Sequence, residues 1–492
     1  MTNEGDRNTT SRGRGRRGDG AGSISPDDPP TPTGGPDRTD HQPREALGSG
    51  YGDAVHKGGI PEIEEALGAP DFQDHMHEVF AELRSRAPVY WSPSLNYWLV
   101  TRFDLVEEVL RNPADYSSLG AEEAYIRRLP AEVIESLQIL PQHFRHPGLI
   151  HSDGAKHTAL RRTVNPSFTP AALAPLAADI RREVIALLEP ARLAGQPFDV
   201  VETLAKPLPV KVIAGLLGVG ADALDRFPGW SVQLARFFTG PLPQPSIAHD
   251  LDGALVEWRE FVCDLLDRRA AEPRDDFISV VAGAIGDGRM TRGDGIAIVV
   301  HALQAGHETS TNLMATSIYL LLMHSEQLEL ARSGPQWLDY AIEEILRFEA
   351  PAVNGRRRAT RPLSLGERPI EAGDTVVVNI AAAHRDPAQY PDPERFDITR
   401  RLTKADHMGF GRGPHFCLGA SLARLEVPIA VDEFLERFPA ARLVRETPHW
   451  KAPRDQRGLA ELWIDPGGSS RGSARTQAVA GASTMSGVSH GR

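Results

Sequence analysis

The sequence predicts a mostly α-helical protein with small β-sheets, which is the α+β class. Segments with apolar residues at helical spacing fill most of the middle of the chain, and residues 295–324 are apolar almost all round. Short alternating segments separated by turn residues occur early and late, at 87–101 and 361–380. A helix that is apolar on every side lies in the centre of a protein, so residues 295–324 are expected to form the core of the fold.

The remaining elements follow from local patterns along the chain. Residues 87–91 and 96–101 alternate like strands, and the "SPSL" between them is typical of a turn. Residues 361–380 indicate hairpins, with turns at Gly366 and Gly373. Four further segments are expected to be helical: 102–112, 171–195, 335–350 and 419–438.

Both ends of the chain differ in composition from its middle. Residues 1–68 are rich in Gly, Arg, Pro, Asp and Thr, and residues 467–492 are small and polar. Such segments cannot bury enough apolar surface to offset the entropy lost on ordering. We therefore expect disordered tails at 1–68 and 467–492, on either side of one folded domain at 69–466.

Charge and cysteine content exclude several classes of protein. The net charge of −12 leaves no excess of Lys and Arg to neutralise phosphates, which argues against nucleic-acid binding. No apolar run reaches the ~18 residues that a membrane span needs, so no membrane partner is expected. Cys263 and Cys417 are the only cysteines and cannot form a disulfide framework, which favours the cytoplasm. Helix packing explains Cys263.

Cys417 lies in an unusual loop, "GFGRGPHFCLG", from Gly409 to Gly419. Its glycines permit a tight backbone that directs N–H groups at one atom, and the helix expected next directs its positive end at the sulfur. A helix dipole alone cannot deprotonate a buried thiol, whereas a bound metal does. No Cys or His lies near it at zinc spacing, so iron in a haem with one axial cysteine fits best.

The pattern FGxGxHxCxG from Phe410 to Gly419 resembles the haem-binding signature of the cytochrome P450 monooxygenases. The resemblance implies the cytochrome P450 fold, with haem b (iron protoporphyrin IX) between the long central helix and the helix after the cysteine loop. Cys417 would be the metal ligand. Phe410, Gly411 and His415 would contact the cofactor.

A second motif, "AGHETS" from Ala305 to Ser310, resembles the oxygen-activating motif of the family. The Thr309 hydroxyl can bond to the Ala305 carbonyl one turn earlier. Gly306 leaves space for dioxygen over the iron. Glu308 is an acid in an apolar helix, so its pKa should be perturbed, and with Thr309 it would relay protons. Glu308, Thr309 and Gly306 are therefore the expected catalytic residues.

Other positions resemble further parts of the family pattern. Glu344 and Arg347 would form a structural ion pair behind the haem, with Arg395 as the third member. Cationic partners of the haem propionates are expected at His157, Arg161, His415 and Arg357. Three consecutive arginines leave Arg356 and Arg358 open as alternatives to Arg357. Arg suits carboxylates because its fork binds both oxygens.

The resemblance also implies where the substrate lies. Residues 118–140 and 236–250 would form the roof of its pocket, and residues 350–354 would add to the wall. The apolar side chains expected in the roof are Ile126, Ile139, Phe237 and Phe238. This mixture suggests a mainly apolar ligand of moderate size with some polar anchoring.

The function implied is a haem-thiolate monooxygenase that inserts one oxygen atom of O2 into a mainly apolar small molecule, by hydroxylation or epoxidation. The habits of the family suggest a tailoring step of specialised-metabolite biosynthesis. One alternative is a peroxide-driven haem peroxygenase, although such members tend to lack the Glu308–Thr309 pair. An alternative of another class is a non-catalytic haem-binding gas sensor, which needs no proton relay.

The electrons would come from another protein. No cysteine cluster and no G-x-G-x-x-G after a strand is left for iron–sulfur or flavin binding. The resemblance implies a ferredoxin and a ferredoxin reductase as donors. Arg412 and Arg424, near the cysteine, are candidates for the docking face, and ordinary solvated arginines are the alternative.

Overall fold

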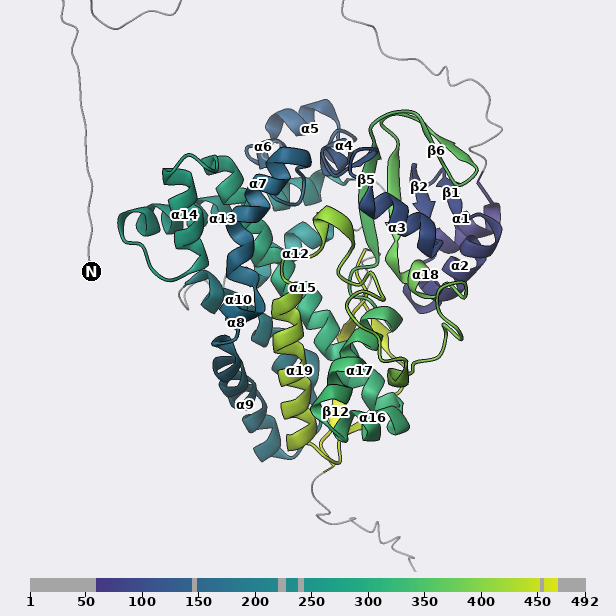
Figure 1. Ribbon diagram of the computed structural model, residues 1–492, viewed down its shortest axis with the longest axis vertical. Coiled ribbons are helices and arrows are strands. Elements are labelled where there is room, and N and C mark those ends of the chain that lie inside the picture. Colours follow the sequence, from purple (N-terminus) through teal and green to yellow (C-terminus); the bar gives the residue numbers. More distant parts are fainter. Residues whose placement is uncertain (1–58, 144–147, 220–226, 238–242, 452–454, 468–492) are drawn as a thin grey trace, which may run out of the picture. The chain divides into compact units, whose positions relative to one another are not determined.

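The computed structural model describes residues 59–143, 148–219, 227–237, 243–451 and 455–467 (Figure 1). Residues 1–58 and 468–492, which make up most of the two predicted tails, lie outside the described residues, so their disorder stays a prediction. Among the helices that the structure describes, none is long and apolar enough to cross a membrane.

The described residues are mostly helical, which confirms the predicted class. Four small β-sheets accompany the helices. The α-helices are α1 (Pro61–Gly68), α2 (Phe72–Arg86), α3 (Phe103–Arg111), α4 (Ala121–Ile126), α5 (Ala131–Ser136), α6 (Leu140–His143), α7 (Gly154–Val164), α8 (Pro170–Leu173), α9 (Leu176–Ala194), α10 (Pro207–Leu217), α12 (Phe227–Phe237), α13 (Pro245–Ala271), α14 (Phe277–Gly286), α15 (Arg292–Met323), α16 (Ser325–Arg332), α17 (Pro335–Phe348), α18 (Ile380–His384) and α19 (Ala420–Arg437).

The main sheet joins segments from both ends of the folded region. Its order is β1 (Val89–Ser92), β2 (Tyr97–Val100), β8 (Thr375–Asn379), β5 (Asn354–Ala359) and β3 (Tyr116–Ser117). The hairpin of β1 and β2 is antiparallel, as its alternating pattern predicts, and β2 pairs with β8 in parallel. The small sheets comprise β6 (Leu363–Leu365) with β7 (Arg368–Ile370); β4 (Phe198–Asp199), β12 (Trp463–Asp465) and β9 (Arg442–Leu443); and β10 (His449–Trp450) with β11 (Leu459–Glu461).

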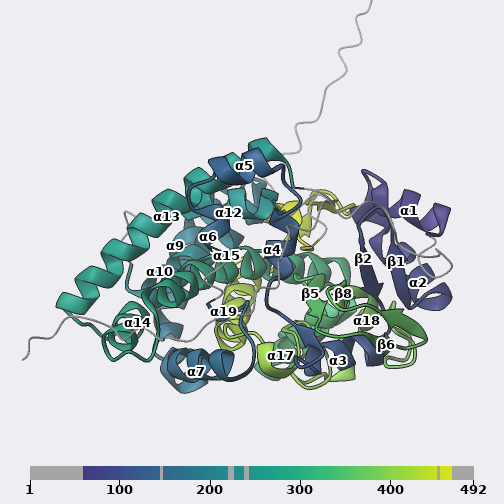
Figure 2. The same cartoon turned by 90° about the horizontal axis from the view of Figure 1, so that it is seen from above.

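The long helix α15 lies at the centre of the helical part of the fold (Figures 1 and 2). It packs against α10, α13, α17 and α19, and nearly all of its second half is buried. It begins three residues before the predicted segment because the Thr291 hydroxyl caps it, accepting a hydrogen bond from the Asp294 N–H. The prediction of a central helix at 295–324 is confirmed.

The predicted ion pair of Glu344 and Arg347 is buried, but the third residue that joins it is not the expected one. Arg347 donates to both carboxylate oxygens of Glu344 at 2.7 and 2.8 Å, and neither side chain is exposed. The Arg395 side chain is 66% exposed, and only its carbonyl oxygen accepts from Arg347. Arg400 instead lies 3.4 Å from Glu344. The assignment of Arg395 is therefore wrong, because its side chain points to solvent.

The folded region begins earlier than the sequence suggested. Helix α1 lies inside the segment 1–68 that we expected to be disordered. Ile63 and Leu67, one helical turn apart, are buried in a cluster with side chains of α2. Glu64 accepts a hydrogen bond of 2.6 Å from the Tyr90 hydroxyl. The predicted boundary at residue 68 is therefore wrong, because two apolar residues in a polar segment were enough to anchor a helix.

Candidate active site

The cysteine loop is folded tightly by two glycines with positive φ. Gly411 and Gly413 each have φ of +73°. A Cβ at Gly413 would lie 2.5 Å from the Leu110 carbonyl oxygen of α3, so only glycine fits there. The Cys417 N–H donates to the Phe410 carbonyl at 2.9 Å and closes the loop. Helix α19 begins at Ala420, one residue after the start of the predicted helix.

The surroundings of the Cys417 sulfur act on it in opposite directions. Burial raises the pKa of the thiol, while the backbone N–H groups of Gly419 and Ala420 lower it. The positive charges of Arg161 and Arg424 also lower it. Burial prevails, so the protein alone keeps the thiol protonated, and a coordinated metal is needed to make it a thiolate.

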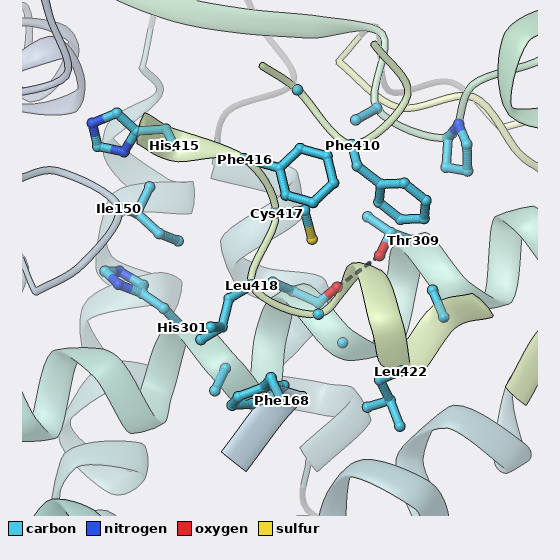
Figure 3. Close-up of a pocket in the computed structure, with 18 of the residues that line it drawn as sticks. Ile150, Phe168, His301, Thr309, Phe410, His415, Phe416, Cys417, Leu418 and Leu422 are labelled. Carbon is cyan, nitrogen blue, oxygen red and sulfur yellow. Dashed lines mark hydrogen bonds between the residues drawn. The ribbon is translucent and has the colours of Figure 1, made fainter. Parts of the chain in front are cut away.

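A cavity of about 370 Å³ separates the cysteine loop from α15. Figure 3 shows the Cys417 sulfur between the loop and the helix, with Thr309 on the helix and Phe410 beside it. Most of the wall is apolar. Its residues from α15 are Ile298, His301, Ala302, Ala305, Gly306, Thr309, Ser310 and Leu313.

The predicted catalytic residues of α15 do not all face this cavity. The Thr309 hydroxyl lines it and donates to the Ala305 carbonyl at 2.7 Å, as predicted (Figure 3). Gly306 also lines it, and a Cβ there would lie 3.3 Å from Ile213 of α10. Close packing against α10 is thus a further reason for glycine.

Glu308 lies outside the cavity lining that the structure describes. Its carboxylate binds the Lys451 ammonium at 2.6 Å, and Lys451 also donates to the Asn312 side chain at 2.9 Å. The acid next to Thr309 is therefore held in an ion pair on another side of the helix. Lys451 was not identified from the sequence, because it is 143 residues away from Glu308 in the chain.

The four predicted cationic residues all line the same cavity. His157 and His415 pack together with ring centroids 4.3 Å apart. Burial and the charges of His415 and Arg161 lower the pKa of His157 to about 4. Although burial raises the pKa of Asp153, its hydrogen bonds with His415, Ser117 and Ser118 lower it to about 2.

Strand β5 separates the three consecutive arginines. Arg357 lines the cavity, whereas Arg356 and Arg358 do not. Arg356 pairs with Asp455 at 2.9 Å. Successive side chains of a strand point to opposite faces, so only the middle arginine can face the cavity. Arg357, the residue chosen from the sequence, is thus the one of the three that lines the cavity, and its contact with a propionate stays a prediction.

The lining of this cavity fits a haem. Cys417 offers one sulfur from the loop, and Arg161 and Arg357 offer guanidinium groups to the two propionates. The buried Nε2 atom of His157 has no hydrogen-bond partner within the described part of the chain. Such an unpaired donor or acceptor at a cavity wall is explained by a polar ligand that completes the site.

Some of the residues expected to line the substrate pocket do not line this cavity. Ile126, Ile139 and Phe237 are absent from the cavity lining, and Phe238 lies outside the described residues. Pro351 and Ala352 do line it, as expected.

The two arginines proposed for redox docking are largely buried. Arg424 binds Glu343 at 2.6 and 2.8 Å and lies over the Phe410 ring. Arg412 is 14% exposed, donates to the Ala405 carbonyl at 2.9 Å and lies 3.4 Å from Glu107. These contacts hold the cysteine loop in place, so neither arginine is available as a freely solvated docking group.

Two residues that line the cavity were not identified from the sequence. Glu426 of α19 is buried and interacts with Ser310 of α15, and burial raises the pKa of its carboxyl to about 7. His301 is buried one turn before Ala305. Both positions carried a signal, namely a polar residue within the apolar stripe of a predicted helix.

The chain is similar to known proteins over most of its length. The sequence profile described as "Cytochrome P450" matches residues 336–454. Cytochrome P450 107B1 of Saccharopolyspora erythraea is 35% identical over 415 residues, 82% of this chain and 99% of the relative. The 6-deoxyerythronolide B hydroxylase of the same organism is 34% identical over 393 residues, 78% of this chain and 93% of the relative.

A solved structure of epothilone D-bound cytochrome P450epoK matches with a TM-score of 0.74 and 29% identity. The match covers 82% of this chain and 98% of that protein. Because sequence and fold both match over nearly the full length of these relatives, the chain belongs to the cytochrome P450 family.

Proposed function

We propose that this cytochrome P450 monooxygenase inserts one oxygen atom of O2 into a mainly apolar small molecule held between α15 and the cysteine loop. The observation that carries the proposal is that the Cys417 thiol and the Thr309 hydroxyl line one largely apolar cavity. Haem b, the cofactor of the family, supplies dioxygen activation when bound through Cys417. Insertion into a C–H bond gives hydroxylation, and insertion into a C=C bond gives epoxidation.

The chain's own residues would bind and orient the cofactor. Arg161, Arg357 and His415 would bind the propionates, and the unpaired Nε2 of His157 would complete that contact. Phe410 and Gly411 would contact the porphyrin from the cysteine loop. The N–H groups of Gly419 and Ala420 would stabilise negative charge on the Cys417 sulfur.

Protons would reach the cavity from Glu308 by way of the Thr309 hydroxyl. The Thr309 hydroxyl faces the cavity and can pass a proton at Oγ1. Glu308 would pass its proton toward Thr309 only after its carboxylate leaves Lys451. Gly306 would leave room for O2. The presence of this acid and alcohol argues against the peroxygenase and gas-sensor alternatives, which need no such relay.

The reaction also needs electron donors and an organic substrate. We propose a ferredoxin and a ferredoxin reductase as the electron donors, because the sequence has no cysteine cluster and no G-x-G-x-x-G after a strand for a donor group of its own. We propose the cytoplasm as the location, because both cysteines are free. A tailoring reaction of specialised-metabolite biosynthesis is supported by similarity to the 6-deoxyerythronolide B hydroxylase.

The test is the difference spectrum of the reduced protein with carbon monoxide. Wild type should show the Soret band of a thiolate-ligated haem, and Cys417→Ala should lose it. Cys263→Ala is the matched control. Cys263 lies on α13 and packs against the core, so this variant should leave the band unchanged. A wild-type spectrum that survives Cys417→Ala would contradict the proposal.

A further inference from the structure

Three histidines form a cluster at the wall of the cavity. His301 of α15 lies between His143 of α6 and His151, with ring centroids 5.4 Å apart in each pair and near-perpendicular rings. We call these three residues the imidazole cluster. Figure 3 shows His301 on the same side of the pocket as Ile150 and away from the Cys417 sulfur. The four cationic residues assigned to the cofactor do not include any member of the cluster.

His301 is a polar side chain in a largely apolar wall, and one of its ring nitrogens lacks a hydrogen bond within the described residues. It is 6% exposed, and its Nδ1 is buried without a hydrogen-bond partner in the part of the chain that the structure describes. Leu149, Ile150, Ile298 and Ala302 line the same cavity. An unpaired buried polar group is unfavourable, so a ligand that pairs with it gains affinity and orientation.

The charges around the cavity indicate which kind of ligand group this is. Glu426 is the only carboxyl group in the described lining, and its raised pKa of about 7 makes it a poor counter-ion for a cation. The groups that face His301 are the other two members of the cluster, and Asp294, two turns earlier on α15, is paired with Lys156. An anionic group is therefore the better partner for His301.

The helix sets the distance between this anchor and the reaction centre. His301, Ala305 and Thr309 are spaced by four residues and lie on one face of α15. With a rise of 1.5 Å per residue, His301 is ~6 Å from Ala305 and ~12 Å from Thr309 along the axis. A substrate anchored at His301 would extend along α15 toward the space under Ala305 and Thr309.

We propose that His301 is a specificity-determining residue that binds the carboxylate of an apolar carboxylic acid, with His143 and His151 holding its ring. This inference rests on the proposed function and narrows its substrate class. The carbon that is oxidised would lie ~6–12 Å from the carboxylate, as measured along α15.

Binding would be coupled to uptake of a proton. Burial, His151 and His143 lower the pKa of His301 well below its usual range, so its ring is neutral in the free protein. A carboxylate beside the ring would favour the charged form and raise that pKa. The acid should therefore bind with uptake of up to one proton, and its affinity should fall as the pH rises.

The test compares straight-chain acids from octanoic to hexadecanoic acid with their methyl esters, using the haem-loaded enzyme. The spin-state change of the haem gives the affinity, and calorimetry in two buffers of different ionisation enthalpy gives the proton uptake. We expect the best acid to bind roughly tenfold to a hundredfold more tightly than its ester, and with proton uptake.

Two variants of similar size separate the possible contributions. His301→Met should abolish the preference for acids, while His301→Gln should keep part of it without proton uptake. His307→Gln, a change of the same kind at a buried position of α15 outside the described cavity lining, should behave as wild type. Acids that bind no better than esters, or an acid preference that survives His301→Met, would overturn the inference. The carbon monoxide spectrum is independent of this outcome and tests the proposed function alone.

Discussion

Glu426 is a single residue whose protonation depends on its place in the fold. Its carboxyl group is 1% exposed between α19 and α15, and burial raises its pKa from 4.5 to about 7. The unfolded chain therefore ionises this group first as the pH rises. Between these two values the folded state binds more protons, so the free energy of unfolding falls with rising pH and is greatest below the unfolded value.

We expect Glu426→Gln to remove this pH dependence. Wild type should lose up to roughly 3 kcal/mol of stability from this group between about pH 4.5 and about pH 8, because its pKa is 4.5 in the unfolded chain and about 7 in the folded protein. The measurement is urea unfolding of the holoenzyme across that range. Glu123 is half-buried and pairs with Arg127, and Glu123→Gln provides the control, which should leave the slope as in wild type. An unchanged slope in Glu426→Gln would show that the group is ionised in the folded protein.

The proton relay makes a second prediction at this scale. Thr309→Ala and Glu308→Gln should lower product formed per O2 consumed, because both remove a group that carries a proton. A positioned acid or base contributes about a hundredfold or more to the rate of a reaction. We therefore expect the product formed per O2 consumed to fall at least about tenfold in both variants. Thr309→Ser keeps the hydroxyl and should retain most coupling. Equal coupling in Thr309→Ala and Thr309→Ser would rule out a role for the hydroxyl.

At the scale of elements, the cysteine loop offers a matched pair of glycines. Gly411 and Gly413 share a φ of +73°, but only at Gly413 would a Cβ collide with backbone, 2.5 Å from the Leu110 carbonyl oxygen. At Gly411 the nearest such atom is 3.7 Å away.

We expect Gly411→Ala to cost about 1–2 kcal/mol, the price of the left-handed backbone for a residue with a side chain. Gly413→Ala should cost clearly more and lower haem content, because α3 must move to admit the new methyl group. Thermal unfolding and the haem-to-protein ratio measure both effects. Equal losses in the two variants would mean that the approach of α3 to the loop is unimportant.

The elements differ in how well local sequence predicts them. Helix α15 follows from its apolar pattern alone, and the Thr309 bond to Ala305 is confirmed because both residues lie within one turn. Arg395 was assigned to the ion pair of Glu344 and Arg347 from a motif, and the structure brings Arg400 there instead. The conformation of the loop decides which arginine points inward, and this conformation cannot be predicted from the local sequence pattern.

For the whole molecule, helix α1 extends the folded region toward the N-terminus beyond the predicted boundary at residue 68. Deletion of residues 1–58 should leave haem content and unfolding midpoint unchanged, if that segment is the disordered tail that its composition predicts. Deletion of residues 1–68 also removes Ile63 and Leu67, which are 1% and 3% exposed. Burial of two such side chains contributes about 3–6 kcal/mol, so this protein should unfold at clearly lower denaturant. Equal unfolding midpoints for the two deletions would show that helix α1 does not stabilise the folded protein.

The sequence by itself determined the fold class, the central helix, the cysteine that faces the cavity and the alcohol opposite it. Each of these depends on residues within one helix or one loop, where spacing and backbone geometry act locally. The tertiary structure alone decided that Glu308 pairs with Lys451, that Glu426 is buried beside Ser310, and that His301 meets two other histidines. Burial and charge pairing arise between segments distant in the chain, so only packing of the folded chain establishes them.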